Sequence, residues 1–226
     1  RRVRHLGALT FSEHVSPPQD PDAAQPVLLR ELARRWPDGL PWDGSVSQYR
    51  ARILRMVELQ PGAWPDLSDA ALQADMAGWL GPWLGGRLRL SQLADLDLLA
   101  CLKGLLDWQQ QQQLDAWLPS HYTSPVGSRR RVNYLAEGPP RCAVPLQEVF
   151  GQADTPTLAE GRVPLVLELL NPAGRPIQVT ADLANFWAGA YSEVRKELRG
   201  RYPKHDWPED PAAAPARRGT GRSRRG

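Results

Sequence analysis

Apolar residues in the first half of the chain recur with the period of an α-helix. From Ala23 to Leu118 they repeat about every 3.6 positions, and clusters containing Pro, Gly and Asp divide the pattern into short helices. Arg50, Arg52 and Arg55 fall largely on an outer face. The expected apolar faces are Val27, Leu28, Leu32 and Trp36; Val46, Tyr49, Ile53, Leu54, Met56 and Val57; residues 69–80 with Ser68 as cap; Leu96, Leu99, Leu102, Leu105 and Leu106; and residues 109–118. Residues 23–119 are therefore expected to form an all-helical module.

The pattern changes after residue 120. Period-two alternation predicts strands over residues 129–135, 141–146, 163–170 and 176–179, and the turn sequence Asn171–Arg175 predicts that the last two form a hairpin. Residues 182–198 then follow a helical period, with Thr180 or Asp182 as cap and Gly200 as the end. Residues 120–210 are expected to form a small mixed domain with one long amphipathic helix, so the fold class is α+β.

The two ends differ in composition from the rest. The first residue is Arg1, so we expect a fragment or a processed product, and residues 1–22 are expected to hold the end of a preceding domain followed by a polar, Pro-rich linker. From Pro211 onwards Ala, Pro, Gly, Ser and Arg dominate, a composition that buries too little apolar area to offset the entropy of ordering. Residues 211–226 are therefore expected to be a disordered basic tail.

The positive charge is concentrated near the end of the chain. Residues 190–226 hold ten Lys or Arg and five Asp or Glu, a net +5, whereas the whole chain carries +3 and the first 189 residues therefore −2. Such asymmetry favours a polyanionic partner, RNA or DNA, although a solvated tail without a specific partner explains it as well. There is no apolar run long enough to span a membrane and no secretory signal, and a cytoplasmic location is expected.

Sequence motifs for catalysis are absent from this chain. It has neither a G-x-x-x-x-G-K-[ST] phosphate loop nor a D-E-x-H segment, and its four His residues show no metal-ligand spacing. Cys101 and Cys142 lie among apolar residues and are expected to be buried free thiols. We therefore expect no catalytic site, no metal and no cofactor within this chain.

Two basic patches are candidate nucleic-acid contacts. In Pro125–Arg131 a Gly-Ser turn and Arg129, Arg130 and Arg131 suit a phosphate; alternatively Gly127 only makes the turn and Arg130 pairs with an internal acid. In Val194–Pro211 basic and aromatic side chains interleave, as in sites that neutralise phosphates and stack on bases, or the segment clamps its own domain. The second patch comprises Arg195, Lys196, Arg199, Arg201, Tyr202, Lys204, His205 and Trp207.

Many short motifs occur in one order along most of the chain. They are Leu40–Trp42, Trp64–Leu67, Trp79–Leu84, Pro125–Arg129, Leu146–Gly151, Thr155–Pro156, Gly161–Leu165, Gly174–Leu183, Phe186–Trp187 and Val194–Pro208. Together they resemble the C-terminal region of the HrpB family of bacterial ATP-dependent helicases, which are DExH-box proteins of superfamily 2.

The resemblance implies a longer parent whose upstream motor domains bind ATP and Mg²⁺ and act on RNA or DNA. This chain would then be an accessory region that adds nucleic-acid contacts and packs on the motor, without catalysis of its own. The alternative is a protein-interaction or structural module, with a protein partner, in which the basic-aromatic segment clamps the domain. The resemblance itself assigns no site residue.

Overall fold

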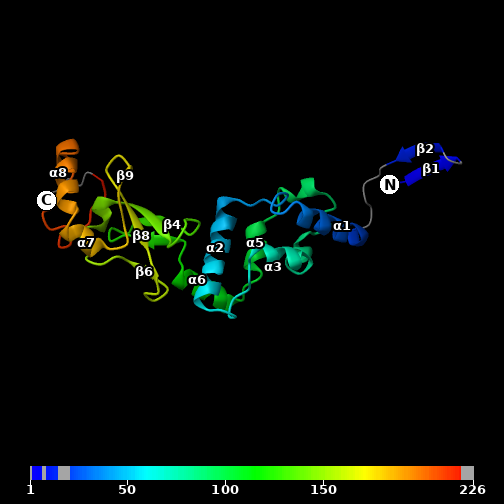
Figure 1. Ribbon diagram of the computed structural model, residues 1–226, viewed down its shortest axis with the longest axis horizontal. Helices are drawn as coiled ribbons and strands as arrows, with labels where there is room; N and C mark the ends of the chain where they lie inside the picture. The colour runs from blue at the N-terminus through cyan, green and yellow to red at the C-terminus, as the bar shows by residue number, and fades with distance from the viewer. Residues whose placement is uncertain (1, 7–8, 15–20, 220–226) are drawn as a thin grey trace, which may run out of the picture. The chain divides into compact units, whose positions relative to one another are not determined.

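The computed structural model describes residues 2–6, 9–14 and 21–219, which fall into two compact units divided between Asp107 and Trp108 (Figure 1). The sequence pattern set the boundary at residue 119, whereas the structure groups residues 108–119 with the second unit. The elements of the first unit are β1 (Arg2–Leu6), β2 (Leu9–His14), α1 (Pro21–Arg34), α2 (Gly44–Leu59), α3 (Asp69–Ala74), α4 (Met76–Trp79), the 3₁₀ turns η1 (Gly81–Trp83) and η2 (Leu90–Leu93), and α5 (Leu98–Lys103).

Side-chain caps define where the helices of the first unit begin. Asp43 accepts hydrogen bonds from the backbone N–H groups of Ser45 and Val46, at 2.7 and 2.8 Å, and so caps α2. Ser68 caps α3 as expected, and Asp97 accepts from the Ala100 N–H at 2.9 Å to cap α5. Helices that are individually too short to be stable are thus started at fixed positions and held by packing.

Several details of the helical module differ from the expectation. Val27 is 65% exposed because Ala24, Leu28 and Leu32 form the buried stripe of α1 instead. Arg52 is buried although it was placed outside, and its guanidinium lies 5.8 Å from the centre of the Tyr49 ring. The helix expected over residues 69–80 is two helices, α3 and α4, because Asp75 leaves the helical conformation and caps α4.

A mixed five-stranded sheet is the centre of the second unit. Its order is β3-β4-β5-β8-β9, and all neighbours are antiparallel except the parallel pair β5 and β8. The elements are α6 (Trp108–Trp117), β3 (His121–Thr123), β4 (Arg129–Asn133), β5 (Arg141–Pro145), η3 (Leu146–Val149), β6 (Thr157–Leu158), β7 (Val163–Pro164), β8 (Val166–Leu170), β9 (Pro176–Thr180), α7 (Leu183–Ala188) and α8 (Tyr191–Arg201). The expected α+β class and the β8–β9 hairpin are confirmed.

An aromatic cluster joins the helices of this unit to its core. The rings of Phe150, Phe186, Trp187 and Tyr191 lie with centroids 5.0 to 6.3 Å apart. The helix expected over residues 182–198 is interrupted at Gly189, whose φ and ψ of −116° and −93° are not helical, so α7 and α8 are separate. α8 also continues through Gly200, where the helix was expected to stop, and ends at Arg201, three residues beyond the expected helical range.

Candidate nucleic-acid interface

The first basic patch lies on the hairpin formed by β3 and β4. In its register His121 is opposite Arg131, Tyr122 opposite Arg130, and Thr123 opposite Arg129. Because successive side chains of a strand point to opposite faces, Arg129 and Arg131 are exposed whereas Arg130 turns inward. The three consecutive arginines are therefore not equivalent.

Arg130 is bound to a carboxylate inside the domain. Its Nε lies 3.1 Å from Oε2 of Glu148, its Nη2 forms a second bond to the same carboxylate, and the Glu148 side chain is only 5% exposed. The hydroxyl of Ser124 also donates to Glu148, at 3.2 Å. Hydrogen bonding to Glu148 raises the pKa of Arg130. Arg130 thus pairs with a buried carboxylate, as the alternative interpretation of this patch predicted.

The Gly-Ser turn between β3 and β4 uses its N–H groups internally. The Gly127 N–H donates to the Ser124 carbonyl oxygen at 2.8 Å, and the Ser128 N–H donates to the Ser124 hydroxyl at 3.2 Å. Gly127 has a φ of +73°, which explains the glycine. These two N–H groups are not available to cradle a phosphate, so an anion at this turn would be held by side chains.

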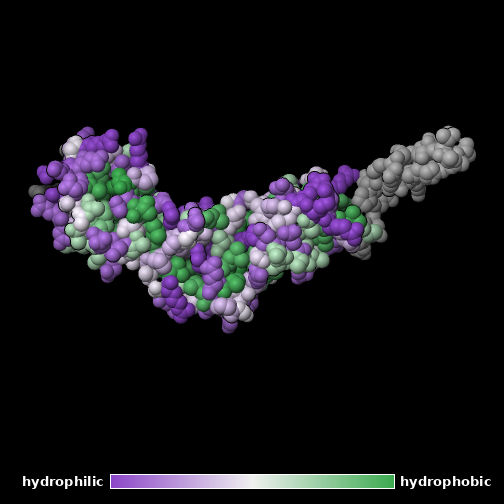
Figure 2. Space-filling view, in the orientation of Figure 1, coloured by the Kyte–Doolittle hydropathy of each residue, from purple (hydrophilic) through white to green (hydrophobic). Residues whose placement is uncertain are grey.

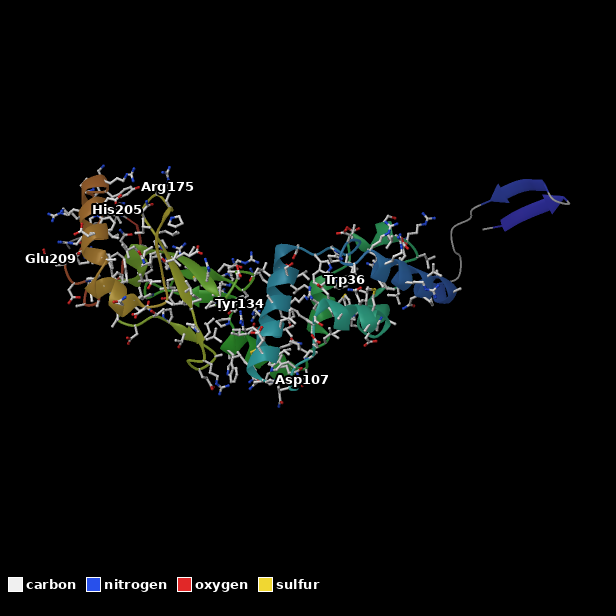
Figure 3. All side chains as sticks on the ribbon, viewed as in Figure 1. Trp36, Asp107, Tyr134, Arg175, His205 and Glu209 are labelled. Atoms are coloured by element: carbon white, nitrogen blue, oxygen red, sulfur yellow. The ribbon has the colours of Figure 1, made fainter. Side chains whose placement is uncertain are left out.

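Residues 202–219, which we call the C-terminal strap, return alongside α8. Arg195 donates to the carbonyl oxygen of Trp207 at 2.9 Å and contacts Glu209 at 3.1 Å, and Tyr191 donates to the carbonyl oxygen of Pro208 at 2.9 Å. Figure 3 shows His205 and Glu209 beside the helix. Arg195, a predicted site residue on α8, therefore ties the strap to that helix.

The aromatic residues of the second patch pack together. Trp207 is only 7% exposed, and its indole N–H donates to the Tyr202 carbonyl oxygen at 2.9 Å. The half-buried His205 ring lies between those of Tyr202 and Trp207, with centroids 6.1 and 6.4 Å away. The packing resembles a small core, and it leaves the Trp207 ring no open face on which a base could stack.

Four cations of the second patch face solvent. Lys196, Arg199 and Arg201 of α8 and Lys204 of the strap are exposed, and no ion pair joins them to an acid among the described residues. Glu193 and Glu197 are exposed on the same helix and lower the local positive potential. Figure 2 shows hydrophilic residues gathered over α8. These four exposed cations are therefore the part of the second patch that a polyanion could contact.

The strap continues past Pro211, where disorder was expected to begin. The Gly151 N–H donates to the Pro211 carbonyl oxygen and the Arg217 N–H to the Gln147 carbonyl oxygen, each at 2.8 Å. The Arg217 side chain also pairs with Asp206 at 3.2 Å. The packed chain thus extends to Arg217. The expectation of a disordered tail now concerns residues 220–226, which lie outside the described residues.

Comparison with known proteins assigns a family. The family model described as "ATP-dependent helicase C-terminal", HrpB_C, matches residues 79–211, more than half of the chain. The chain belongs to the HrpB_C family. The ATP-dependent RNA helicase HrpB of Escherichia coli K12 is 46% identical over 220 residues, which are 96% of this chain and 27% of that relative. The resemblance inferred from the motifs is confirmed.

Two solved structures resemble this HrpB_C chain. The E. coli DExH-box NTPase HrpB has a TM-score of 0.85 and 45% identity, over 93% of this chain and 26% of that one. The E. coli DEAH/RHA helicase HrpB has a TM-score of 0.73 and 44% identity, over 89% and 26%. The chain thus spans about a quarter of the length of the relatives it matches.

The two cysteines and the metal-ligating side chains of this HrpB_C chain bear on whether it could hold a nucleophile or a metal ion. Burial raises the pKa of Cys101 to about 11 and that of Cys142 to about 12, so both thiols are uncharged at neutral pH. Both are buried and free, as expected. Within the described part of the chain, no three His, Cys, Asp or Glu side chains gather as a metal site, and no helix has the length and apolarity to cross a bilayer.

The sequence reasoning missed the arginines at the end of the strap. Arg218 is exposed, and its Nη2 lies 3.9 Å from the position that a Cβ on Gly127 would take. Composition alone assigned Arg217 and Arg218 to a disordered tail. The pairing of Arg217 with Asp206 connects residues 11 positions apart in an irregular segment, and no periodicity signals it.

Proposed function

We propose that this HrpB_C chain is the accessory C-terminal region of an ATP-dependent helicase and contributes contacts to RNA or DNA. The names of the relatives support this, since one is an ATP-dependent RNA helicase and another a DExH-box NTPase. ATP and Mg²⁺ would act in the motor domains of a longer, cytoplasmic parent, and this region would pack on the motor without catalysis of its own.

The observation that carries the proposal is the exposed charge at the end of α8. Lys196, Arg199, Arg201 and Lys204 lie close in sequence around the helix C-terminus, face solvent and lack an ion-pair partner among the described residues. Cations that neutralise phosphates release condensed counterions, which supplies most of the sequence-independent affinity for nucleic acid. We assign the phosphate contacts to these four residues and to Arg129 and Arg131.

The other predicted contacts take a supporting part in this proposal. Arg130, Arg195, Tyr202, His205 and Trp207 hold β4, α8 and the strap in place, so they position the exposed cations. Of the predicted aromatic contacts, only Tyr202, which is half-buried, is still proposed to stack on a base.

The test is binding of labelled single-stranded RNA and of DNA of the same sequence to the chain, from about 50 to about 200 mM salt. The triple change Arg199→Glu, Arg201→Glu and Lys204→Glu is expected to weaken binding and to reduce the salt slope by roughly 2 for a single strand. Arg30→Glu, at an exposed arginine of α1, controls for charge reversal outside the patch, at one third of the triple variant's change in net charge. Salt-independent binding, or equal affinity of the triple variant and wild type, would contradict the proposal.

A structural or protein-interaction module is the second candidate. The bonds of Arg195 and Tyr191 to the strap favour a clamp, and the exposed Trp108, at 73%, offers apolar surface to a protein partner. The two candidates differ in what removal of the strap does. A clamp lowers the free energy of unfolding when it is lost, whereas a contact surface lowers only the affinity for nucleic acid.

A further inference from the structure

The strap runs from the end of α8 to the β3–β4 turn. Beyond Trp207 its Pro211 accepts a hydrogen bond from Gly151, its Arg217 donates to Gln147, and its Arg218 reaches the turn at Gly127. Two hydrogen bonds and the proximity of Arg218 to Gly127 mark successive points on one path. The two basic patches of the sequence, remote from each other along the chain, are therefore connected by the strap.

Two exposed arginines meet the turn at the end of this path. Arg129 begins β4 two residues after Gly127, and the Arg218 guanidinium lies beside Gly127 itself. No ion pair joins either to a carboxylate among the described residues, whereas Arg130 is neutralised by Glu148 and Arg217 by Asp206. We call Arg129, Arg218 and the Gly127 turn the hairpin corner.

The arginines of β4 act on a histidine of β3 beside the turn. Burial, and then the charges of Arg129 and Arg131, hold the pKa of His121 below its usual value. The Arg129 Nη2 lies 3.4 Å from Nδ1 of His121. The sequence between Asp210 and Arg218 contains no Asp or Glu. No acid close to Arg218 on its N-terminal side therefore offsets its charge.

We propose that the hairpin corner is a second contact for the phosphate backbone of a nucleic acid, and that the strap places Arg218 there. This rests on the proposed function, which already assigns Arg129 to phosphate, and adds to it Arg218 and its placement by the strap, at a site separate in sequence from the cations of α8. Recognition would be of the phosphodiester backbone by arginine side chains, without base specificity, because the turn's own N–H groups are engaged.

The first arm of the test removes charge. Arg129→Gln with Arg218→Gln should reduce the salt slope for single-stranded RNA by roughly 1.4, so that wild type loses roughly sevenfold more affinity than the variant between about 50 and about 200 mM salt. Arg30→Gln with Arg89→Gln, two exposed arginines of the first unit, is the matched control. Tryptophan fluorescence during unfolding verifies that each variant is folded.

The second arm moves the strap without changing charge. A Cβ on Gly151 would lie 2.9 Å from the carbonyl oxygen of Ala214, so Gly151→Ala should displace the strap from its path. Gly138 has the same φ of +79° but no atom within 4 Å of such a Cβ, so Gly138→Ala carries the same backbone strain alone. We expect Gly151→Ala to weaken RNA binding several-fold and Gly138→Ala to leave it unchanged.

The outcomes separate this proposal from the function on which it rests. If the α8 triple variant loses affinity while the corner variant binds as wild type, the corner proposal is overturned, and the proposed function stands on the cations of α8 without Arg129. If Gly151→Ala binds as wild type, placement by the strap is overturned. If wild type binds neither RNA nor DNA in a salt-dependent way, both fall. Reduced affinity in both arms, with both controls unaffected, supports the corner.

Discussion

In both the β4 strand and the α8 helix, one basic side chain of a run faces the core and its neighbours face solvent. The two elements differ in their side-chain period, which is about 2 residues in a strand and 3.6 in a helix. In β4 the middle arginine of three, Arg130, turns inward to Glu148 and its neighbours face solvent. In α8 Arg195 shares the inner side with Tyr191 and Leu198, while Lys196 and Arg199 face outward. A basic run on a packed element thus divides into a structural residue and exposed ones, and the period of the element decides which is which.

The largest expected effect tests the strap side of this comparison. Trp207→Ala removes a buried indole and its hydrogen bond to Tyr202, so the free energy of unfolding should fall by about 3 to 5 kcal/mol. Trp108→Ala removes a side chain that is 73% exposed and should cost less than about 0.5 kcal/mol. Urea unfolding followed by circular dichroism measures both, and equal costs would show that the strap is not a clamp.

A smaller effect should separate neighbours within β4. Arg130→Ala leaves the Glu148 carboxylate buried without its cation, which should lower the free energy of unfolding by about 3 kcal/mol. Arg129→Ala, one position away on the exposed face, should change it by less than about 0.5 kcal/mol. Thermal unfolding of the pair measures the contrast. Similar melting temperatures for the two variants would contradict the division of roles.

The smallest expected effect concerns His121. Because its folded-state pKa is lowered, the unfolded chain binds the proton more readily, so the free energy of unfolding should fall as pH drops below about 6.5 and be unaffected above it. Replacing Arg129 and Arg131 by Gln should raise the pKa of His121 partway towards 6.5, since burial, the larger cause, remains. Titration by NMR measures the shift, and an unchanged pKa would argue against positive charge at the corner.

Local signals in the sequence predicted local structure well. Ser68 as a cap and Asn171–Arg175 as a hairpin turn are confirmed, because each depends on hydrogen bonds between residues at most four positions apart. The idea that Arg130 meets an internal acid is confirmed too. The sequence alone did not name Glu148, since that pairing depends on how β4 packs against η3.

Structure that depends on distant residues was not predictable from the same patterns. The strap after Pro211 has the composition of a disordered tail, and its order comes from the backbone groups of Gly151 and Gln147. The break between α7 and α8 at Gly189 interrupts an apolar stripe that is continuous in the sequence. In both cases tertiary packing decides what a local pattern leaves open.

The position of the strap also governs the order in which the second unit can be completed during synthesis. Tyr191 and Arg195 donate to the carbonyl oxygens of Pro208 and Trp207, respectively, and the backbone groups of Gly151 and Gln147 are paired only when Pro211 and Arg217 are in place. A growing chain can form the sheet first, but these donors and acceptors stay unpaired until residues 207–217 have left the ribosome. Until then the nascent domain exposes the surface that the strap covers.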